Sequence, residues 1–402
     1  MDAPSLALYA DAIVRDGLMI GEGDVLAVHP EPIQRELAVA LADAGYRAGA
    51  RYVDVLETDP RITRARALGA PEDTLDWRPA WEDARMRELV REGAGIVWIA
   101  GSEDPQVLAD VPPARAVRRV TDRAGLPPYR RAVGKADARF AVVAWPSPAW
   151  SRQVYPELGA EAAVEALGRD LLSFARLGPG DPPDGWRRHA EQLAERAARL
   201  TALDLRELRL TAPGTDLRLA LPPGTSWRGG VNDVRGHRIT PNIPTEEVFT
   251  SPDQSATSGP FRCTRPLALA GRVIEGIAGE FRRGRLVRIE AADDGDREFL
   301  AAYLARDRGA SRLGELALVD SSSRVGAAGR PFFTTLLDEN AAAHIAFGLG
   351  FADCRAPGAP PPNRSVVHLD VMIGSPEMDV EAVDGTGRSV TIIADGAFAA
   401  GL

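Results

Sequence analysis

The sequence predicts an N-terminal α/β domain with a mostly parallel sheet (residues 1–183), followed by a strand-rich α+β catalytic domain (residues 184–402). A length of 402 residues is ample for two hydrophobic cores. In the first part, short apolar runs alternate with segments of helical periodicity, which is typical of parallel sheets wound with helices. In the second part, strand-like alternation dominates. A Gly- and Pro-rich stretch, 178–185, predicts a loop near the boundary.

The first domain is predicted from strands that alternate with helical segments. A helix is predicted from 33 to 48, because Leu37, Leu41 and Ala44 recur at helical spacing. Neither a GxGxxG nor a GxxxxGK[ST] signature follows a strand, so nucleotide binding has no support. The strands are predicted at 25–28, 51–56, 96–100 and 140–145.

The second domain is predicted to open with a polar helix over 186–200. Strands at 208–210 and 217–221 follow, joined through a Pro-Gly turn, and alternation continues from 267 to 289. A further helix is predicted at 297–305.

The composition indicates in which compartment the protein is expected and which classes of partner it is not expected to bind. The net charge of −9 argues against nucleic acid or an anionic membrane as a partner. Two cysteines, Cys263 and Cys354, make no disulfide framework and fit a reducing cytoplasm. The first residues lack the features of a signal peptide, and no apolar run is long enough to span a bilayer. We therefore expect a soluble, cytoplasmic protein.

A candidate metal site begins with the apolar strand that contains His368 and Asp370. Residues two apart in a strand point to the same face, so this imidazole and this carboxylate would lie side by side. Such a pair suits zinc, cobalt, manganese or iron. Taken alone, a surface or core His-x-Asp is the commoner case.

Two other stretches supply carboxylates. Glu246 and Glu247 lie between a proline turn and a strand, where they could provide one metal ligand and one base; alone, they would suggest an exposed turn. Glu315 stands at the head of an apolar strand, where a carboxylate is unfavourable to bury unless it is paired or bound to metal. Its alternative position is the solvent end of that strand.

A second histidine lies in a segment that reads as a helix. Residues 338–348 begin with acidic side chains, which favour a helix N-terminus, and His344 follows among alanines. A lone histidine there is more often a core residue than a ligand. Together, however, the candidates form a set large enough for two metal ions, which can activate a water molecule for hydrolysis. The set is Glu247, Glu315, His344, His368 and Asp370.

Several blocks of the sequence resemble one known family along nearly the whole chain. The blocks are 101–105, 145–150, 242–250, 313–315, 339–344 and 368–374. They resemble the aminopeptidase T and aminopeptidase S family of dinuclear bacterial metalloaminopeptidases, the thermophilic metalloproteases. The resemblance implies a C-terminal catalytic domain, two divalent metal ions (zinc, cobalt or manganese) and a homodimer that encloses the sites.

The resemblance also implies a set of site residues. One member of the Glu246/Glu247 pair would bind metal, and we favour Glu247 because the family tolerates glycine at the position before it. Glu246 then remains an accessory catalytic candidate, together with Glu315, which is also a ligand candidate. The remaining implied ligands are His344, His368 and Asp370.

One position departs from the family. The family places a tyrosine seven residues after the histidine of the 339–344 block, and this chain has Phe351 there. If a helix continued, seven residues would be about two turns, and Phe351 would face the site without a hydroxyl. A lost transition-state donor typically costs about a hundredfold or more in rate.

The first functional hypothesis is a metal-dependent aminopeptidase, or a specialised amide hydrolase, acting on a peptide or small amide. A metal-bound hydroxide would attack the amide carbonyl next to a free amino terminus. The alternative is a mononuclear iron ring-cleaving dioxygenase on a related fold, with His344, His368 and Asp370 as its triad. Retention of Glu247 and Glu315 argues against that alternative. A degenerate, non-enzymatic binding protein is a third possibility, against which the number of retained ligands also argues.

Overall fold

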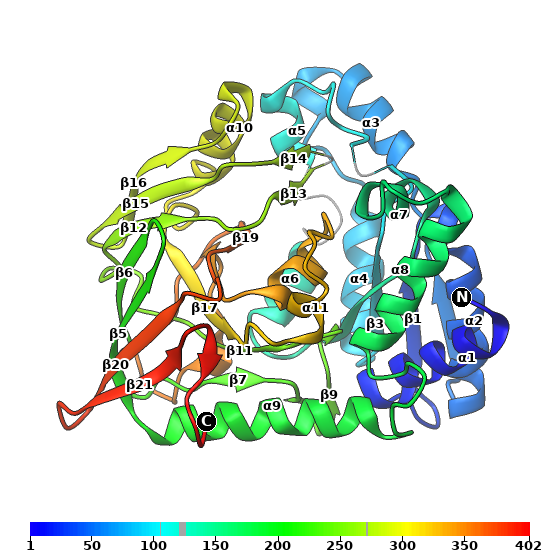
Figure 1. The fold of residues 1–402 in the computed structure, drawn as a ribbon. Helices are drawn as coiled ribbons and strands as arrows, with labels where there is room; N and C mark the ends of the chain where they lie inside the picture. Colours follow the sequence, from blue (N-terminus) through cyan, green and yellow to red (C-terminus); the bar gives the residue numbers. More distant parts are fainter. Residues whose placement is uncertain (105, 120–125, 271) are drawn as a thin grey trace.

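The computed structural model describes residues 1–104, 106–119, 126–270 and 272–402 (Figure 1). Residue 105, the last of the 101–105 block, lies outside these ranges. A five-stranded sheet in the order β10–β4–β3–β1–β2 forms the N-terminal part, and all its neighbouring strands are parallel. Its strands are β1 (Val25–His29), β2 (Tyr52–Val55), β3 (Gly95–Ala100), β4 (Arg139–Ala144) and β10 (Asn242–Ile243).

Helices cover both faces of this sheet, which explains why its strands read as continuous apolar runs. Successive residues of β1 point alternately to a core with α1 (Ala3–Asp11) and α2 (Arg35–Ala48), and to a core with α4 (Ala80–Arg91) and α6 (Pro127–Val133). The predicted α/β organisation is therefore confirmed. The longer of the remaining helices are α3 (Pro60–Gly69), α5 (Pro113–Arg119), α7 (Pro148–Val154), α8 (Ala160–Phe174), α9 (Gly185–Ala202) and α10 (Asp294–Leu304).

The central sheet of the C-terminal part is antiparallel and has the order β19–β18–β17–β11–β7. One of its faces packs into the largest hydrophobic core, through residues such as Leu316, Ile345 and Val371. Because side chains alternate along a strand, the intervening residues face the other way, towards the N-terminal part. The strands are β7 (Arg228–Gly229), β11 (Glu247–Thr250), β17 (Leu313–Val319), β18 (His344–Gly348) and β19 (His368–Met372).

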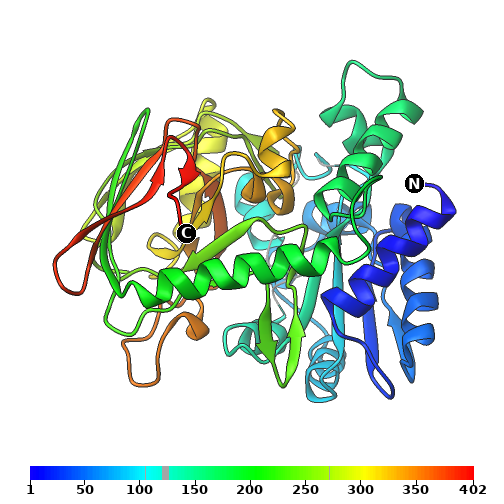
Figure 2. The same cartoon turned by 60° about the horizontal axis from the view of Figure 1, so that its bottom comes forward.

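Further antiparallel sheets complete the strand-rich part. A five-stranded sheet, β22–β21–β20–β5–β6, contains β5 (Leu205–Ala212), β6 (Thr215–Ala220), β20 (Asp379–Asp384), β21 (Ser389–Ala394) and β22 (Ala397–Phe398). The smaller sheets are built from β8 (Asn232–Val234), β9 (His237–Ile239), β12 (Gly259–Arg262), β13 (Leu267–Leu269), β14 (Arg272–Ile274), β15 (Ala278–Arg282) and β16 (Arg285–Glu290). Helix α9 runs along the bottom of the molecule in Figure 1 and crosses the front of both parts in Figure 2.

The prediction of a helix over 338–348 is wrong. Only the short α12 (Thr335–Asp338) and a 3₁₀ turn at Glu339–Ala341 precede His344, which begins β18. Every residue of β18 is buried, and the strand lies between β17 and β19. The sheet therefore satisfies the backbone of β18 on both sides, and this tertiary pairing overrides the helix preference of the alanine-rich segment.

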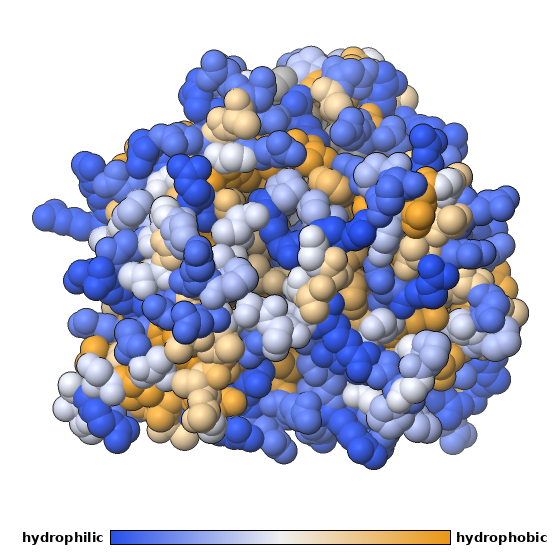
Figure 3. All heavy atoms as spheres, viewed as in Figure 1, coloured by the Kyte–Doolittle hydropathy of each residue, from blue (hydrophilic) through white to orange (hydrophobic). Residues whose placement is uncertain are grey.

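The two parts of the chain are joined by more than one connection. The predicted loop at 178–185 lies between α8 and α9, while β10, from the later half, pairs with β4 in the first sheet. The exact domain boundary at 183/184 stays a prediction. In the described ranges, no helix is both long and apolar enough to cross a membrane. The face in Figure 3 is mainly hydrophilic, with hydrophobic residues visible in its upper middle and at the lower left.

Candidate metal centre

The five predicted metal-binding residues come together on one face of the central antiparallel sheet. Glu247 begins β11, Glu315 lies in β17, His344 begins β18, and His368 and Asp370 lie in β19. Strand register and alternation direct these side chains to the face opposite the hydrophobic core. Four strands that are distant in sequence thus supply one site.

Small residues between the ligand candidates leave room on this face. Ala317 pairs with His344, and Gly348 pairs with His368. Ala346 pairs with the carboxylate-bearing residue of each neighbouring strand. Gly348 has φ of 98°, and a Cβ there would lie 2.1 Å from a backbone oxygen, so a side chain at this position would be strained.

The ligand candidates form two overlapping groups. We call Glu247, Glu315 and His344 the inner group, and Glu315, His368 and Asp370 the outer group. Within each group, one potential ligand atom per residue lies within 4.8 Å of the others. The inner group is buried, whereas His368 of the outer group is partly exposed. Glu315 belongs to both groups, so its two carboxylate oxygens can serve neighbouring ions.

Both imidazoles are oriented by backbone carbonyls. His344 Nδ1 lies 3.3 Å from the oxygen of Ala342, and His368 Nδ1 lies 3.0 Å from the oxygen of Leu349. An Nδ1–H that donates to these oxygens leaves Nε2 as the coordinating nitrogen. The Nε2 atom of His344 is 3.1 Å from Glu247, and that of His368 is 3.2 and 3.3 Å from the carboxylates of the outer group.

The charges of the site favour cations. Two buried carboxylate oxygens, Glu247 Oε2 and Asp370 Oδ1, have no hydrogen-bond donor among the described residues other than the Nε2 atoms of His344 and His368, which lie 3.1 and 3.2 Å away. Burial, together with the charges of Glu247 and Asp370, raises the pKa of Glu315 to about 7, although His368 acts in the opposite direction. Buried carboxylates at this spacing repel one another unless protons or metal ions neutralise them. Nitrogen and oxygen donors in this arrangement fit divalent zinc, cobalt or manganese.

Glu339 is a further buried carboxylate that the predicted site did not include. Its Oε1 accepts a hydrogen bond of 3.0 Å from Asn242 Nδ2, and the residue is 8% exposed. Burial, and next the charges of Asp370 and Glu247, raise the pKa of Glu339 well above its usual value. The acidic residues at 338 and 339 indicate a helix start when the sequence is considered alone, and Glu339 is therefore absent from the predicted ligand set although it opens the 339–344 block.

The two groups open onto a cavity of about 480 Å³. Phe351 lines this cavity although no helix leads to it, and its ring centre lies 5.3 Å from that of His368. Phe351 therefore lies beside the candidate ligand His368, while the helical reason given for this position is wrong. Phe249 also packs edge-to-face against the Phe351 ring, with a centre distance of 5.3 Å. The aromatic pair forms part of the apolar lining of the cavity next to the outer group.

Comparison with known proteins identifies the family. The family model of the thermophilic metalloproteases (M29) matches residues 2–398. Aminopeptidase T of Thermus thermophilus is 38% identical over 396 residues, which cover 95% of this chain and 96% of that protein. This chain belongs to the thermophilic metalloprotease family. It is a hydrolase of the metallopeptidase class, as the resemblance predicted.

Other relatives of this metallopeptidase agree with that assignment. Aminopeptidase PepS of Streptococcus thermophilus is 34% identical and covers 98% of this chain and 97% of its own length. The solved structure of wild-type AmpT from Thermus thermophilus matches with a TM-score of 0.86 and 36% identity, over 98% of this chain and 99% of that one. The 2,5-dihydroxypyridine dioxygenase of Pseudomonas putida KT2440 matches at a TM-score of 0.51 and 12% identity, over 98% and 96% of the two chains, and shares the fold alone.

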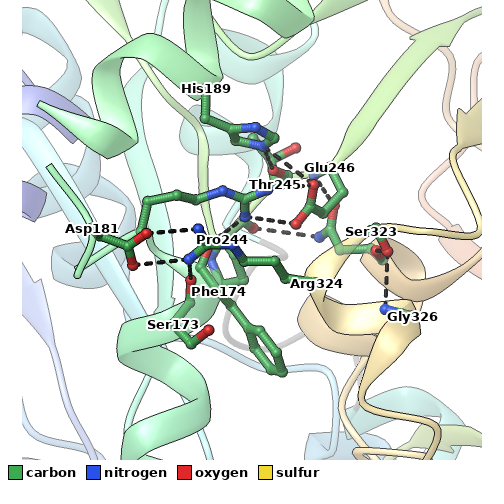
Figure 4. A network of polar contacts seen from close by, with 12 residues as sticks. Ser173, Phe174, Asp181, His189, Pro244, Thr245, Glu246, Ser323, Arg324 and Gly326 are labelled. Atoms are coloured by element: carbon green, nitrogen blue, oxygen red, sulfur yellow. Dashed lines mark hydrogen bonds and ion pairs between the residues drawn. The ribbon is translucent and has the colours of Figure 1, made fainter. Parts of the chain in front are cut away.

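Glu246 of this metallopeptidase lies apart from both metal groups and does not line the cavity. Its carboxylate accepts hydrogen bonds of 2.6 and 2.9 Å from the Arg176 guanidinium, as Figure 4 shows. Nearby, the Nε2–H of His189 donates to the Thr245 oxygen at 2.8 Å. Burial and the charge of Arg176 lower the pKa of His189 to about 4, so this imidazole is neutral at pH 7. The catalytic role predicted for Glu246 stays a prediction.

The contacts of Glu246 connect the two parts of the protein. Arg176 follows α8, and the neighbouring ion pair joins Asp181 to Arg324 at 2.6 Å (Figure 4). In addition, the backbone N–H of Glu246 donates to the Asn340 side-chain oxygen at 2.7 Å. We call this cluster the Arg176 network. It holds the segment leading into β11, and therefore Glu247, against α8 and the loop after it.

We expect Glu246→Ala to lower the free energy of unfolding by about 3–5 kcal/mol, because it leaves the buried Arg176 without its partner. Urea titration in the presence of a chelator measures this effect without a contribution from bound metal. The matched control is Glu195→Ala, which removes an exposed ion pair with Arg199 and should change stability by about 0.5 kcal/mol or less. Equal effects of the two substitutions would contradict a stabilising role for the Arg176 network.

Proposed function

We propose that this protein is a dinuclear aminopeptidase, which cleaves the first peptide bond of a peptide or the equivalent bond of a small amide. The observation that carries the proposal is the membership of Glu315 in both the inner and the outer group. A shared carboxylate is the arrangement expected for two ions a few ångströms apart. When bound, such ions would supply Lewis-acid activation of a water molecule and of the amide carbonyl.

The site residues have distinct proposed roles in holding the two ions. Glu247 and His344 would hold one ion, and His368 and Asp370 the other, with Glu315 between them. Their orientation comes from the sheet and from the two Nδ1 hydrogen bonds, which fix each imidazole before a substrate arrives. Phe351 contributes a hydrophobic wall in place of the family tyrosine and offers no hydrogen bond to the reacting carbonyl.

Glu339 is our candidate for moving a proton between water, substrate amide and leaving amine. It lines the same cavity, belongs to neither metal group and forms no ion pair with a described arginine. Asn242 holds its Oε1, and its Oε2 accepts no hydrogen bond from the described residues, so Oε2 can exchange a proton with a reacting group. General acid–base catalysis requires such a positioned carboxyl group.

We further propose that the enzyme is a cytoplasmic homodimer that uses zinc, cobalt or manganese. The metals follow from the donor set of the two groups, and the dimer follows from the family resemblance. Cys263 and Cys354 are both free thiols, as expected in a reducing compartment.

Metal content tests the proposed function directly. Protein purified without chelator should contain about two divalent ions per chain by elemental analysis and should hydrolyse dipeptides. Chelation should abolish that hydrolysis, and zinc, cobalt or manganese should restore it. A single iron per chain without peptide hydrolysis would instead favour the dioxygenase alternative, with His344, His368 and Asp370 as ligands.

A further inference from the structure

The cavity at the metal groups extends beyond them to a basic side chain on another element. Arg130 lies on α6, which Figure 1 shows in the middle of the molecule, and it lines the same cavity as His368 and Asp370. Among the described residues that line this cavity, Arg130 is the sole arginine or lysine. The cavity is of ordinary size for a small-molecule site.

The guanidinium of Arg130 has no anionic partner within the described ranges. In the part of the chain that the structure describes, no carboxylate oxygen lies within 4.0 Å of the Arg130 guanidinium, and the charge of Asp307 acts on it only from a longer distance. Burial lowers the pKa of Arg130 from its usual value, and Arg306 acts in the same direction, while Tyr303 and Asp307 offset part of this effect. A partly desolvated guanidinium without a carboxylate is unfavourable and binds an anion strongly, in a two-pronged geometry that matches a carboxylate.

Tyr303 connects Arg130 with the outer group. This buried tyrosine lies on α10 and lines the same cavity as Arg130, His368 and Asp370. Arg130 therefore belongs to the same small enclosure as the metal ligands, at a part of the wall formed by α6. Tyr129, Val133 and Leu269 add an apolar surface to the enclosure.

From this arrangement we propose that Arg130 binds the C-terminal carboxylate of a short peptide whose amino end lies at the metal groups. This inference rests on the proposed function. A chain that extended far beyond the site would carry no charge to neutralise the guanidinium, whereas a di- to tetrapeptide ends inside or at the mouth of the cavity. The apolar wall suits uncharged side chains, so the terminal carboxylate is the anion that Arg130 meets. The enzyme is thus a short-peptide aminopeptidase that prefers free acids.

The test compares peptides with a free carboxylate and their C-terminal amides. We expect wild-type enzyme to favour the acid in the series Leu-Gly, Leu-Gly-Gly and Leu-Gly-Gly-Gly by about tenfold or more in kcat/KM, at least at one length. Arg130→Met should raise KM for that acid by a similar factor, with kcat and all amide kinetics little changed. Arg130→Lys should restore part of the preference. The matched control is Arg131→Met, an exposed arginine on the same helix, which should behave as wild type.

A binding measurement separates this inference from the proposed function. Calorimetry with analogues whose scissile amide is replaced by a methylene-amine should show the same acid preference, and its loss in Arg130→Met, even if no peptide is hydrolysed. Failure to hydrolyse any peptide or amide would therefore overturn the proposed function alone. Equal binding of acid and amide by wild type would overturn the role of Arg130.

Discussion

Glu315→Gln is expected to remove both metal ions and to reduce kcat/KM by at least about 1,000-fold. Glu315 is the one residue shared by the inner and outer groups, so its loss weakens both at once. Glutamine has nearly the same shape, and the site is buried, so the sheet should remain intact. Removal of one of several crowded carboxylates should leave the metal-free protein equally or more stable, because like-charge repulsion decreases.

Elemental analysis after dialysis, dipeptide hydrolysis and urea unfolding together check this prediction. The matched control is Asp353→Asn, which removes a carboxylate that lines the cavity outside both metal groups. That variant should keep about two ions per chain and most of its activity. Retention of both ions by Glu315→Gln would contradict the assignment of Glu315 as the shared ligand.

Glu339→Gln is expected to retain the metals and to lower kcat by about 10²–10⁴-fold. Its amide oxygen can still accept the hydrogen bond from Asn242, so the position of the side chain is preserved. What the variant lacks is a carboxyl group that can take up and release a proton. Metal content equal to that of wild type, with KM little changed, would separate this effect from the loss of metal in Glu315→Gln.

The pH dependence of Glu339→Gln provides a second check. If Glu339 moves a proton, its replacement should remove one limb of the kcat profile of wild type. A variant with unchanged kcat would show that another group, or water alone, performs proton transfer. Loss of metal would show that Glu339 supports the ligands instead.

The fold was largely predictable from the sequence because local pattern and tertiary structure agree in most elements. The apolar runs at 25–28 and 96–100 are strands of a sheet covered on both faces, and α2 has the predicted periodicity. Residues 344–348 form a strand where the sequence predicted a helix. Alanine and an acidic start favour a helix locally, whereas pairing with β17 and β19, which depends on residues elsewhere in the chain, makes this segment a central strand.

The site was predictable in residue type but not in geometry. Alternation along a strand implies that Glu246 and Glu247 point to opposite faces, but the sequence does not show which face meets His344. The structure directs Glu247 to the metal groups and Glu246 to Arg176. The position of Arg130 was equally invisible, because it depends on how α6 packs against strands that lie far away in sequence.

The pairing of β10 with β4 makes the two parts of this enzyme depend on each other. Asn242 and Ile243 extend the first sheet beside β4, and Glu247, only four residues after Ile243, begins a strand of the second sheet. Asn242 also holds Glu339. One short segment therefore contains an edge strand of the first sheet, the hydrogen-bond partner of the candidate proton carrier and the first candidate metal ligand. A fragment that begins near residue 184 would retain every candidate ligand but would lose β4, against which this segment is held. The N-terminal sheet thus helps to position the proposed catalytic site, and recombination of the two halves between relatives must preserve the pairing of β4 with β10.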